Sequence, residues 1–100
     1  MKIAIFIKKN ELTVLHEEKA HVVIFNIEED KVVGVENISL EEQDKKSIEN
    51  WLKQQSINRI YLSEIDNQTH QKLNSKGIKV KTLESLENDK LFKSLALIIS

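Results

Sequence analysis

The sequence contains no cysteine and only two glycines among its 100 residues. Without a thiol the chain can form neither a disulfide nor a cysteine-ligated zinc or iron–sulfur site, and it has no thiolate nucleophile. Gly34 and Gly77 stand far apart, so neither belongs to a glycine-rich loop of the kind that cradles phosphates. The lack of cysteine also fits a cytoplasmic protein, and we expect that location.

Long apolar runs and a strong net charge are missing as well. The longest apolar runs, among them Leu95–Ile99, are far shorter than the roughly 20 residues that a membrane-spanning helix needs. The 15 basic and 16 acidic side chains nearly cancel and are interspersed, so they create no strong field for a polyanion or an anionic membrane. We therefore expect no nucleic-acid partner, no membrane association and no signal peptide.

Apolar residues make up 40% of the chain and recur at regular spacing, which indicates a packed globule. A chain of this length normally forms one hydrophobic core. We therefore expect a single domain over residues 1–100.

Several segments have the composition of β-strands. Lys2–Ile7 is apolar on successive positions, which predicts a strand covered on both faces at the centre of a sheet. His21–Ile27 and Lys31–Ile38 are separated by three acidic residues and predict an antiparallel hairpin. Asn58–Leu62 and Ile78–Thr82 predict two more strands. Lysines alternate along the last one, which is typical of a sheet edge.

Two helices are indicated between these strands. Ser39 and Glu42 have the spacing of a capping box and predict a helix start. The next apolar residues follow at helical spacing and should cover the sheet: Ile48, Trp51 and Leu52. Asp66 can cap a second helix that continues to about Ser75, and Gly77 stands where a left-handed residue would end it.

The remaining segments are less regular. Residues 8–19 mix charges with the alternating pair Leu12 and Val14, which suggests a long excursion with a short extended piece. Near the carboxyl end, Leu86, Phe92 and Leu95 indicate a closing helix capped by Ser85, although the final apolar run can also be interpreted as a strand.

This order of elements predicts an α/β fold. Strands joined through helices should be parallel with right-handed crossovers, while the first hairpin contributes the antiparallel element. The simplest topology is a five-stranded mixed sheet in the order 3-2-1-4-5 with strand two antiparallel. That is the three-layer ribonuclease H-like architecture.

In this topology the first and fourth strands lie side by side, and their connections leave in opposite directions. Ligands favour the crevice that forms at the carboxyl ends of such strands. The candidate binding residues are those that leave the two strands or could fold across them: Lys9, Asn10, His16, Lys19, Ser63 and Glu64. The alternative is that all of these are ordinary solvated loop residues.

Catalysis finds little support in the residues. Ribonuclease H-like nucleases hold two metals with carboxylates, one of which normally comes from the first strand. Here that strand contains Lys2 but no acidic residue, and no Ser/His/Asp signature occurs. We expect a protein that is not an enzyme.

Three segments carry a family resemblance: Met1–Ile5, Val23–Val33 and Leu73–Val80. Together they resemble the dinitrogenase iron-molybdenum cofactor biosynthesis family, small domains that bind or carry metalloclusters or their precursors. The resemblance implies a metallocluster or small-molecule binding accessory protein. It implies an iron-containing cluster as the ligand, with no metal-binding residues identified.

The sequence departs from the family at two motifs. His16–Lys19 stands where members carry a His-Phe-Gly-Arg-like segment, and Ser63–Asp66 replaces a glycine-rich turn with carboxylates that should repel an anionic cluster. A second function therefore stays open, that of a protein-interaction module that has kept the fold and lost the cofactor. Its partner surface would be the edge at Lys79–Thr82 or the loop Lys8–Lys19.

Overall fold

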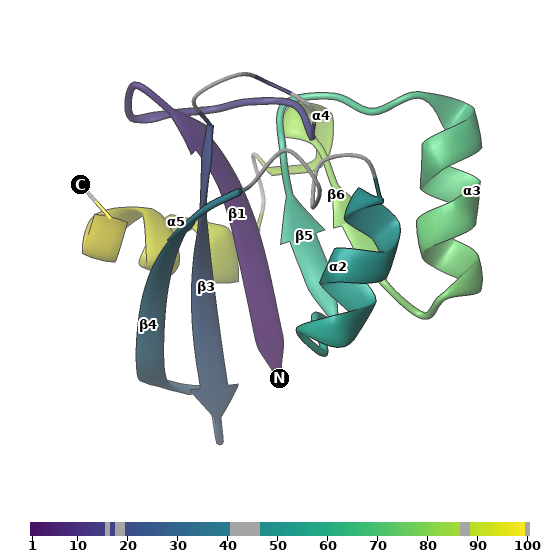
Figure 1. The fold of residues 1–100 in the computed structure, drawn as a ribbon. Coiled ribbons are helices and arrows are strands. Elements are labelled where there is room, and N and C mark those ends of the chain that lie inside the picture. Colours follow the sequence, from purple (N-terminus) through teal and green to yellow (C-terminus); the bar gives the residue numbers. More distant parts are fainter. Residues whose placement is uncertain (16, 18–19, 41–46, 87–88, 100) are drawn as a thin grey trace.

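The computed structural model describes residues 1–15, 17, 20–40, 47–86 and 89–99. They form a mixed sheet with helices on both sides (Figure 1). The strands are β1 (Lys2–Lys8), β2 (Glu11–Leu12), β3 (His21–Glu28), β4 (Lys31–Ser39), β5 (Arg59–Tyr61) and β6 (Lys79–Lys81). The helices are α2 (Ile48–Gln54), α3 (Asn67–Ser75), α4 (Leu83–Leu86) and α5 (Lys90–Ile99).

The order of the strands confirms the predicted sheet. The path β4-β3-β1-β5-β6 is the expected 3-2-1-4-5 order, with β3 antiparallel to both neighbours and β5 parallel to β1 and β6. β1 is central and buried on both faces, and β6 lies at an edge, as expected. The structure adds one strand, because Glu11–Leu12 pairs with the end of β1. This is the short extended piece expected between residues 8 and 19, although Val14 lies outside it.

Two hairpins are closed by two-residue turns. Lys9 and Asn10 connect β1 to β2 with φ angles of 53° and 65°, and Glu29 and Asp30 connect β3 to β4 with φ angles of 50° and 64°. Positive φ at both central residues is the geometry of a type I′ turn, whose twist matches that of the paired strands. Asn and Asp tolerate this conformation better than most residues.

The helix boundaries agree only in part with the sequence pattern. α3 begins after its cap Asp66 and ends at Ser75, and Gly77 just beyond it has a left-handed φ of 80°, as predicted. α2 is described from Ile48, after Ser47. Ser39, predicted to start this helix, is the last residue of β4, and Glu42 lies outside the described residues.

The carboxyl-terminal segment forms two helices where one was predicted. Ser85 lies inside α4, so it does not stand at the N-cap position of the long helix α5, which begins at Lys90. That role belongs to Asp89, whose Oδ1 accepts a hydrogen bond of 2.9 Å from the backbone N–H of Phe92. The final apolar run is helical, which decides against the strand interpretation. No helix within the described ranges is long and apolar enough to cross a membrane.

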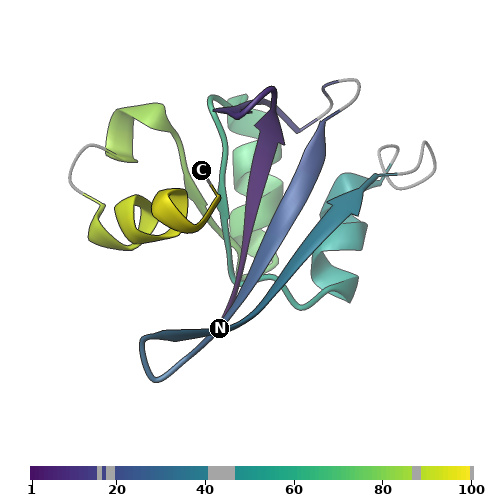
Figure 2. The ribbon, with the colours of Figure 1, turned by 90° about the vertical axis from the view of Figure 1, so that its left-hand side faces the viewer.

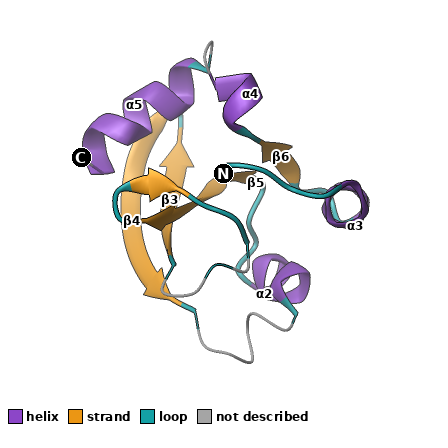
Figure 3. Cartoon of the chain, turned by 90° about the horizontal axis from the view of Figure 1, so that it is seen from above, coloured by secondary structure: helices purple, strands orange, loops and turns teal. Residues whose placement is uncertain are grey.

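The helices divide the core into two layers, one on each face of the sheet (Figure 3). We call them the α2/α3 face and the α4/α5 face. On the α2/α3 face, Phe6 and Ile60 from the strands pack with Leu52 and Leu73 from the helices. The α4/α5 face contains strand residues and two buried helix residues: Ile5, Phe25, Tyr61, Leu86 and Leu95.

Tyr61 brings a polar group into the α4/α5 face. Its hydroxyl donates a hydrogen bond of 3.1 Å to Asp89 Oδ2 and accepts one of 3.4 Å from Arg59 Nη1. Its ring lies 5.1 Å from that of Phe92, centroid to centroid. Burial is the main cause that raises the pKa of Tyr61 above its ordinary value. The contacts of Tyr61 therefore connect β5 to the first turn of α5.

Candidate functional site

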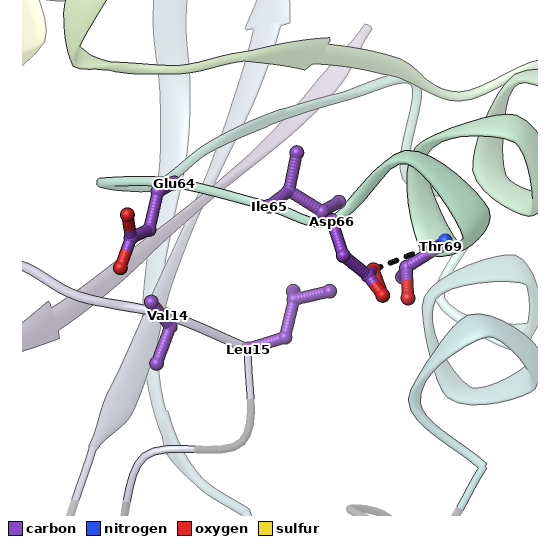
Figure 4. A pocket seen from close by; sticks show the side chains of 6 residues that line it. All are labelled: Val14, Leu15, Glu64, Ile65, Asp66 and Thr69. Atoms are coloured by element: carbon purple, nitrogen blue, oxygen red, sulfur yellow. Dashed lines mark hydrogen bonds between the residues drawn. The ribbon is translucent and has the colours of Figure 1, made fainter.

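A pocket of about 530 Å³ opens beyond the carboxyl ends of β1 and β5. One wall comes from the chain that follows β2, and the other from the connection between β5 and α3 (Figure 4). Its lining residues are Val14, Leu15, Glu64, Ile65, Asp66 and Thr69. This is the crevice that the strand order predicts, because β1 and β5 are the neighbours whose connections diverge.

Backbone hydrogen bonds hold the two walls together. The N–H of Thr13 donates a hydrogen bond of 2.9 Å to the carbonyl of Phe6, which anchors the chain after β2 to β1. The N–H of Ser63 then donates to the carbonyl of Thr13 at 3.1 Å. The carbonyl of Ser63 accepts a bond of 3.4 Å from Leu83 at the start of α4. Ser63 therefore links three segments that are distant in the sequence.

The interior of the pocket is largely apolar. Leu15 is 4% exposed and belongs to the core of the α2/α3 face, and Ile65 packs against that core. Val14 is half-buried beside them. Apolar walls with a few polar groups are typical of small-molecule sites, because burial supplies the affinity and polar groups supply orientation.

Two carboxylates give the pocket a negative rim. Glu64 and Asp66 are both exposed. Asp66 also caps α3, since its Oδ1 accepts a hydrogen bond of 3.1 Å from the N–H of Thr69 (Figure 4). Hydrogen bonding from Thr69 is the main cause that lowers the pKa of Asp66 below its ordinary value. Asp66 is therefore ionised at neutral pH and is a poor proton donor.

The predicted site residues are distributed unevenly. Glu64 lines the pocket and Ser63 adjoins it through the backbone bonds above. Lys9 and Asn10 form the turn between β1 and β2 and are not among the lining residues. They were expected to leave β1 toward the crevice, but the short strand β2 turns the chain back immediately. His16 and Lys19 lie outside the described residues.

Sequence reasoning missed the apolar part of the site. Val14 and Leu15 stand in the irregular segment after β2, and Thr69 lies in the first turn of α3. Apolar residues in a segment without clear periodicity were the available signal for the first two. Thr69 offered none, because its place in the pocket depends on how α3 leaves β5.

Metal-ligating groups do not converge within the part of the chain that the structure describes. Those residues contain no group of three or more His, Cys, Asp or Glu side chains that could hold a metal ion. The lining residues offer two carboxylates and no imidazole or thiolate. This donor set does not fit an anionic iron-containing cluster, which carboxylates repel.

Solved structures share this fold. The chain matches a "putative dinitrogenase" from Methanocaldococcus jannaschii with a TM-score of 0.64 and 25% identity, over 99% of this chain and 88% of that one. It matches the crystal structure of PH0822 with a TM-score of 0.68 and 22% identity, over 82% of this chain and 76% of that one. No family model and no curated protein matches the sequence. The predicted resemblance is confirmed as a divergent structural match.

Proposed function

We propose that this protein is a non-catalytic accessory domain that binds a small molecule in the pocket between β1, β5 and α3. The observation that carries the proposal is the position of the pocket, which opens at the diverging connections of β1 and β5 with an apolar interior. The proposal includes the ribonuclease H-like assignment of the fold, for which the strand order and the two helical layers are the support. It also includes a cytoplasmic location.

The charge of the pocket favours one class of ligand. Glu64 and Asp66 face the same pocket, and no basic residue is among those that line it. An organic cation with an apolar body satisfies both the rim and the interior, while an anionic metallocluster satisfies neither. We therefore place a cationic or neutral small molecule ahead of the metallocluster that the family resemblance implies.

A non-catalytic role is proposed because of what Asp66 does in the pocket. General acid–base catalysis needs a group whose pKa lies near the working pH. Asp66 is used as a helix cap, and its pKa is lowered, which moves it away from that range. Both features suit a fixed negative charge that orients a ligand.

An NMR titration with three matched probes tests this function. We expect an aliphatic amine to shift the backbone amides of Val14, Ile65 and Thr69, and the corresponding alcohol to shift them less. The matching carboxylate should leave them unchanged. Glu64→Lys should weaken binding of the amine roughly tenfold, because a reversed rim charge converts attraction into repulsion.

Two controls make this test decisive. Glu28→Lys changes an exposed carboxylate at the opposite end of the sheet and should leave amine binding unaltered. Anaerobic incubation with ferrous iron and sulfide, with and without His16→Ala, measures the alternative ligand. Stoichiometric iron with visible absorbance that His16→Ala reduces would identify a metallocluster carrier and contradict the preference for a cation.

A protein-interaction module is the second candidate function. The observation in its favour is the long exposed strand β4, which has valine side chains at the sheet edge. A titration in which no probe perturbs the pocket amides would favour this function over ligand binding. The edge at β6 and the loop after β1 stay predictions as partner surfaces.

A further inference from the structure

The two edges of the sheet differ in length and chemistry. β6 has three residues and carries Lys79 and Lys81, which is a common way to discourage pairing with other chains. β4 has nine residues, and its Val33 and Val35 are 55% and 50% exposed. Among the described strands β4 pairs with β3 alone, and it lies at the outer side of the sheet (Figures 1 and 2). A long apolar edge with unpaired backbone groups is a template for another strand.

The backbone orientation of β4 follows from hydrogen bonds at the start of the sheet. Ile27 donates to the carbonyl of Met1 at 2.7 Å and accepts from the Met1 amino group at 2.8 Å, so its backbone groups turn toward β1. Orientation alternates along a strand, so Asn26 turns toward its β4 partner, Gly34. The N–H and C=O of Gly34 therefore point toward β3. The next residue, Val35, directs its N–H and C=O outward.

A β-bulge changes which side chains of β4 share a face. The register with β3 shifts at Val33, which has no partner in β3. Lys31 lies opposite Glu28, and Glu36 lies opposite Ile24. Glu28 and Ile24 are an even number of positions apart and share a face. Lys31 and Glu36 therefore also share one face, although a regular strand would place them on opposite faces.

The bulge brings two valines together on the other face. Val32 lies opposite Ile27 and Val35 lies opposite Phe25. Since Ile27 and Phe25 share a face, Val32 and Val35 do too. Val32 also directs its backbone outward, because the preceding residue, Lys31, faces β3. The outer edge of β4 thus presents two backbone positions, each with a valine on the same side.

We propose that β4 pairs antiparallel with β4 of a second copy of this chain, about a two-fold axis between Val33 and Gly34. In this register Val32 of each copy lies opposite Val35 of the other, and both residues direct their backbone groups toward the interface. Lys31 of each copy lies opposite Glu36 of the other on the same face. Symmetry makes each pair occur twice. Both copies carry the bulge at Val33. Val33 of each copy therefore lies opposite Gly34 of the other, and neither strand has an unmatched residue at the interface.

Charge complementarity favours a second copy over an unrelated partner. Lys31 and Glu36 are both exposed, and neither forms an ion pair with another described residue of its own chain. Across a two-fold axis each supplies the opposite charge that the other needs, and directly opposed pairs of opposite charge stabilise a sheet. The pairing also removes the long free edge, because the combined sheet then ends on β6 in both copies.

Charge reversal tests the register. Sedimentation equilibrium of the full chain should show a monomer–dimer equilibrium that shifts with concentration. Lys31→Glu and Glu36→Lys should each weaken the dimer roughly tenfold, because each variant places like charges opposite one another at two symmetric positions. The double variant should restore the affinity to within about threefold of the wild type. Lys79→Glu on the opposite edge is the control and should leave the affinity unchanged.

Proline substitution tests the backbone pairing by a separate route. Val35→Pro removes an N–H that faces outward, so it should abolish the dimer while the monomer stays folded. Glu36→Pro removes an N–H that faces β3 and should destabilise the monomer itself. Circular dichroism of each variant separates the two effects.

Two results would overturn the proposal. One is a wild-type chain that is monomeric at every concentration. The other is a dimer that persists in folded Val35→Pro, or that the two single charge variants leave unchanged. Neither result bears on the pocket, which lies at the end of the sheet away from the β3–β4 turn, so the proposed function is tested independently.

Discussion

The two faces of the sheet are both apolar but are closed in different ways. The buried cluster on the α2/α3 face consists of nonpolar and tryptophan side chains, from Ala4 in β1 to Ile78 before β6. The α4/α5 face buries Tyr61, whose hydroxyl bonds to Asp89 at the start of α5. Apolar burial stabilises without direction, whereas a hydrogen bond holds two groups in one arrangement. The α4/α5 face thus adds a polar contact that helps to determine where α5 begins.

The largest expected effect comes from a leucine on each face. Leu52 in α2 and Leu95 in α5 are both 0% exposed. Replacing either with alanine should lower the free energy of unfolding by about 3 kcal/mol, from lost burial and the remaining cavity. Urea denaturation measures both. A loss below about 1 kcal/mol for Leu95→Ala alone would show that α5 contributes little to closing its face.

The cap of α5 should have the next largest effect. Asp89→Ala removes the acceptor for the Phe92 N–H and the partner of the Tyr61 hydroxyl. We expect a loss of about 1–2 kcal/mol, with faster hydrogen exchange in the first turn of α5. Asp89→Asn keeps an acceptor and should lose less. Equal losses for the two variants would mean that the charge of Asp89, and not its hydrogen bonds, is the stabilising feature.

The smallest effect isolates the hydroxyl of Tyr61. Tyr61→Phe removes the hydroxyl's two hydrogen bonds, to Asp89 and from Arg59, and should cost about 1 kcal/mol at neutral pH. Folding raises the pKa of Tyr61, so the folded state holds the proton more tightly than the unfolded state. This contribution is complete below the unfolded pKa near 10.0 and is lost as the pH rises through the folded pKa.

The pH dependence can be assigned to this residue because the chain has one tyrosine. Between neutral pH and alkaline pH the wild type should lose more stability than Tyr61→Phe, as denaturation at several pH values measures. Lysines titrate in both proteins and cancel in the difference. If the free energies of unfolding of the two proteins fell in parallel as the pH rises, this would contradict a raised pKa for Tyr61.

Much of the fold could be predicted because the signals are local. Successive apolar positions identified β1 as a central strand, and the alternating lysines identified β6 as an edge. Asp66 and Gly77 marked the two ends of α3. Local patterns were weaker near the carboxyl end. Ser85 has the residue type of a cap but lies inside α4. The cap of α5 is Asp89, which directly precedes the helix and accepts a hydrogen bond from the N–H of Phe92 in its first turn.

The candidate site could be predicted only as a location. Glu64 was identified because the strand order places the end of β5 beside β1. Lys9 and Asn10 were assigned to the same place, but their turn pairs the chain back onto β1 before it reaches the pocket. Leu15 was missed because nothing local distinguishes a pocket wall from an ordinary core residue.

The sequence by itself determined the five main strands, the hairpin of β3 and β4, and the order of the sheet, because these depend on hydrophobic spacing and on residues that favour turns. Tertiary structure alone decided the pocket, which needs the hydrogen bond between Thr13 and Ser63 to bring two distant segments together. It also decided the shared face of Lys31 and Glu36, because the bulge that aligns them exists only in the pairing of β4 with β3. Both features depend on contacts between residues far apart in the chain, which no local pattern contains.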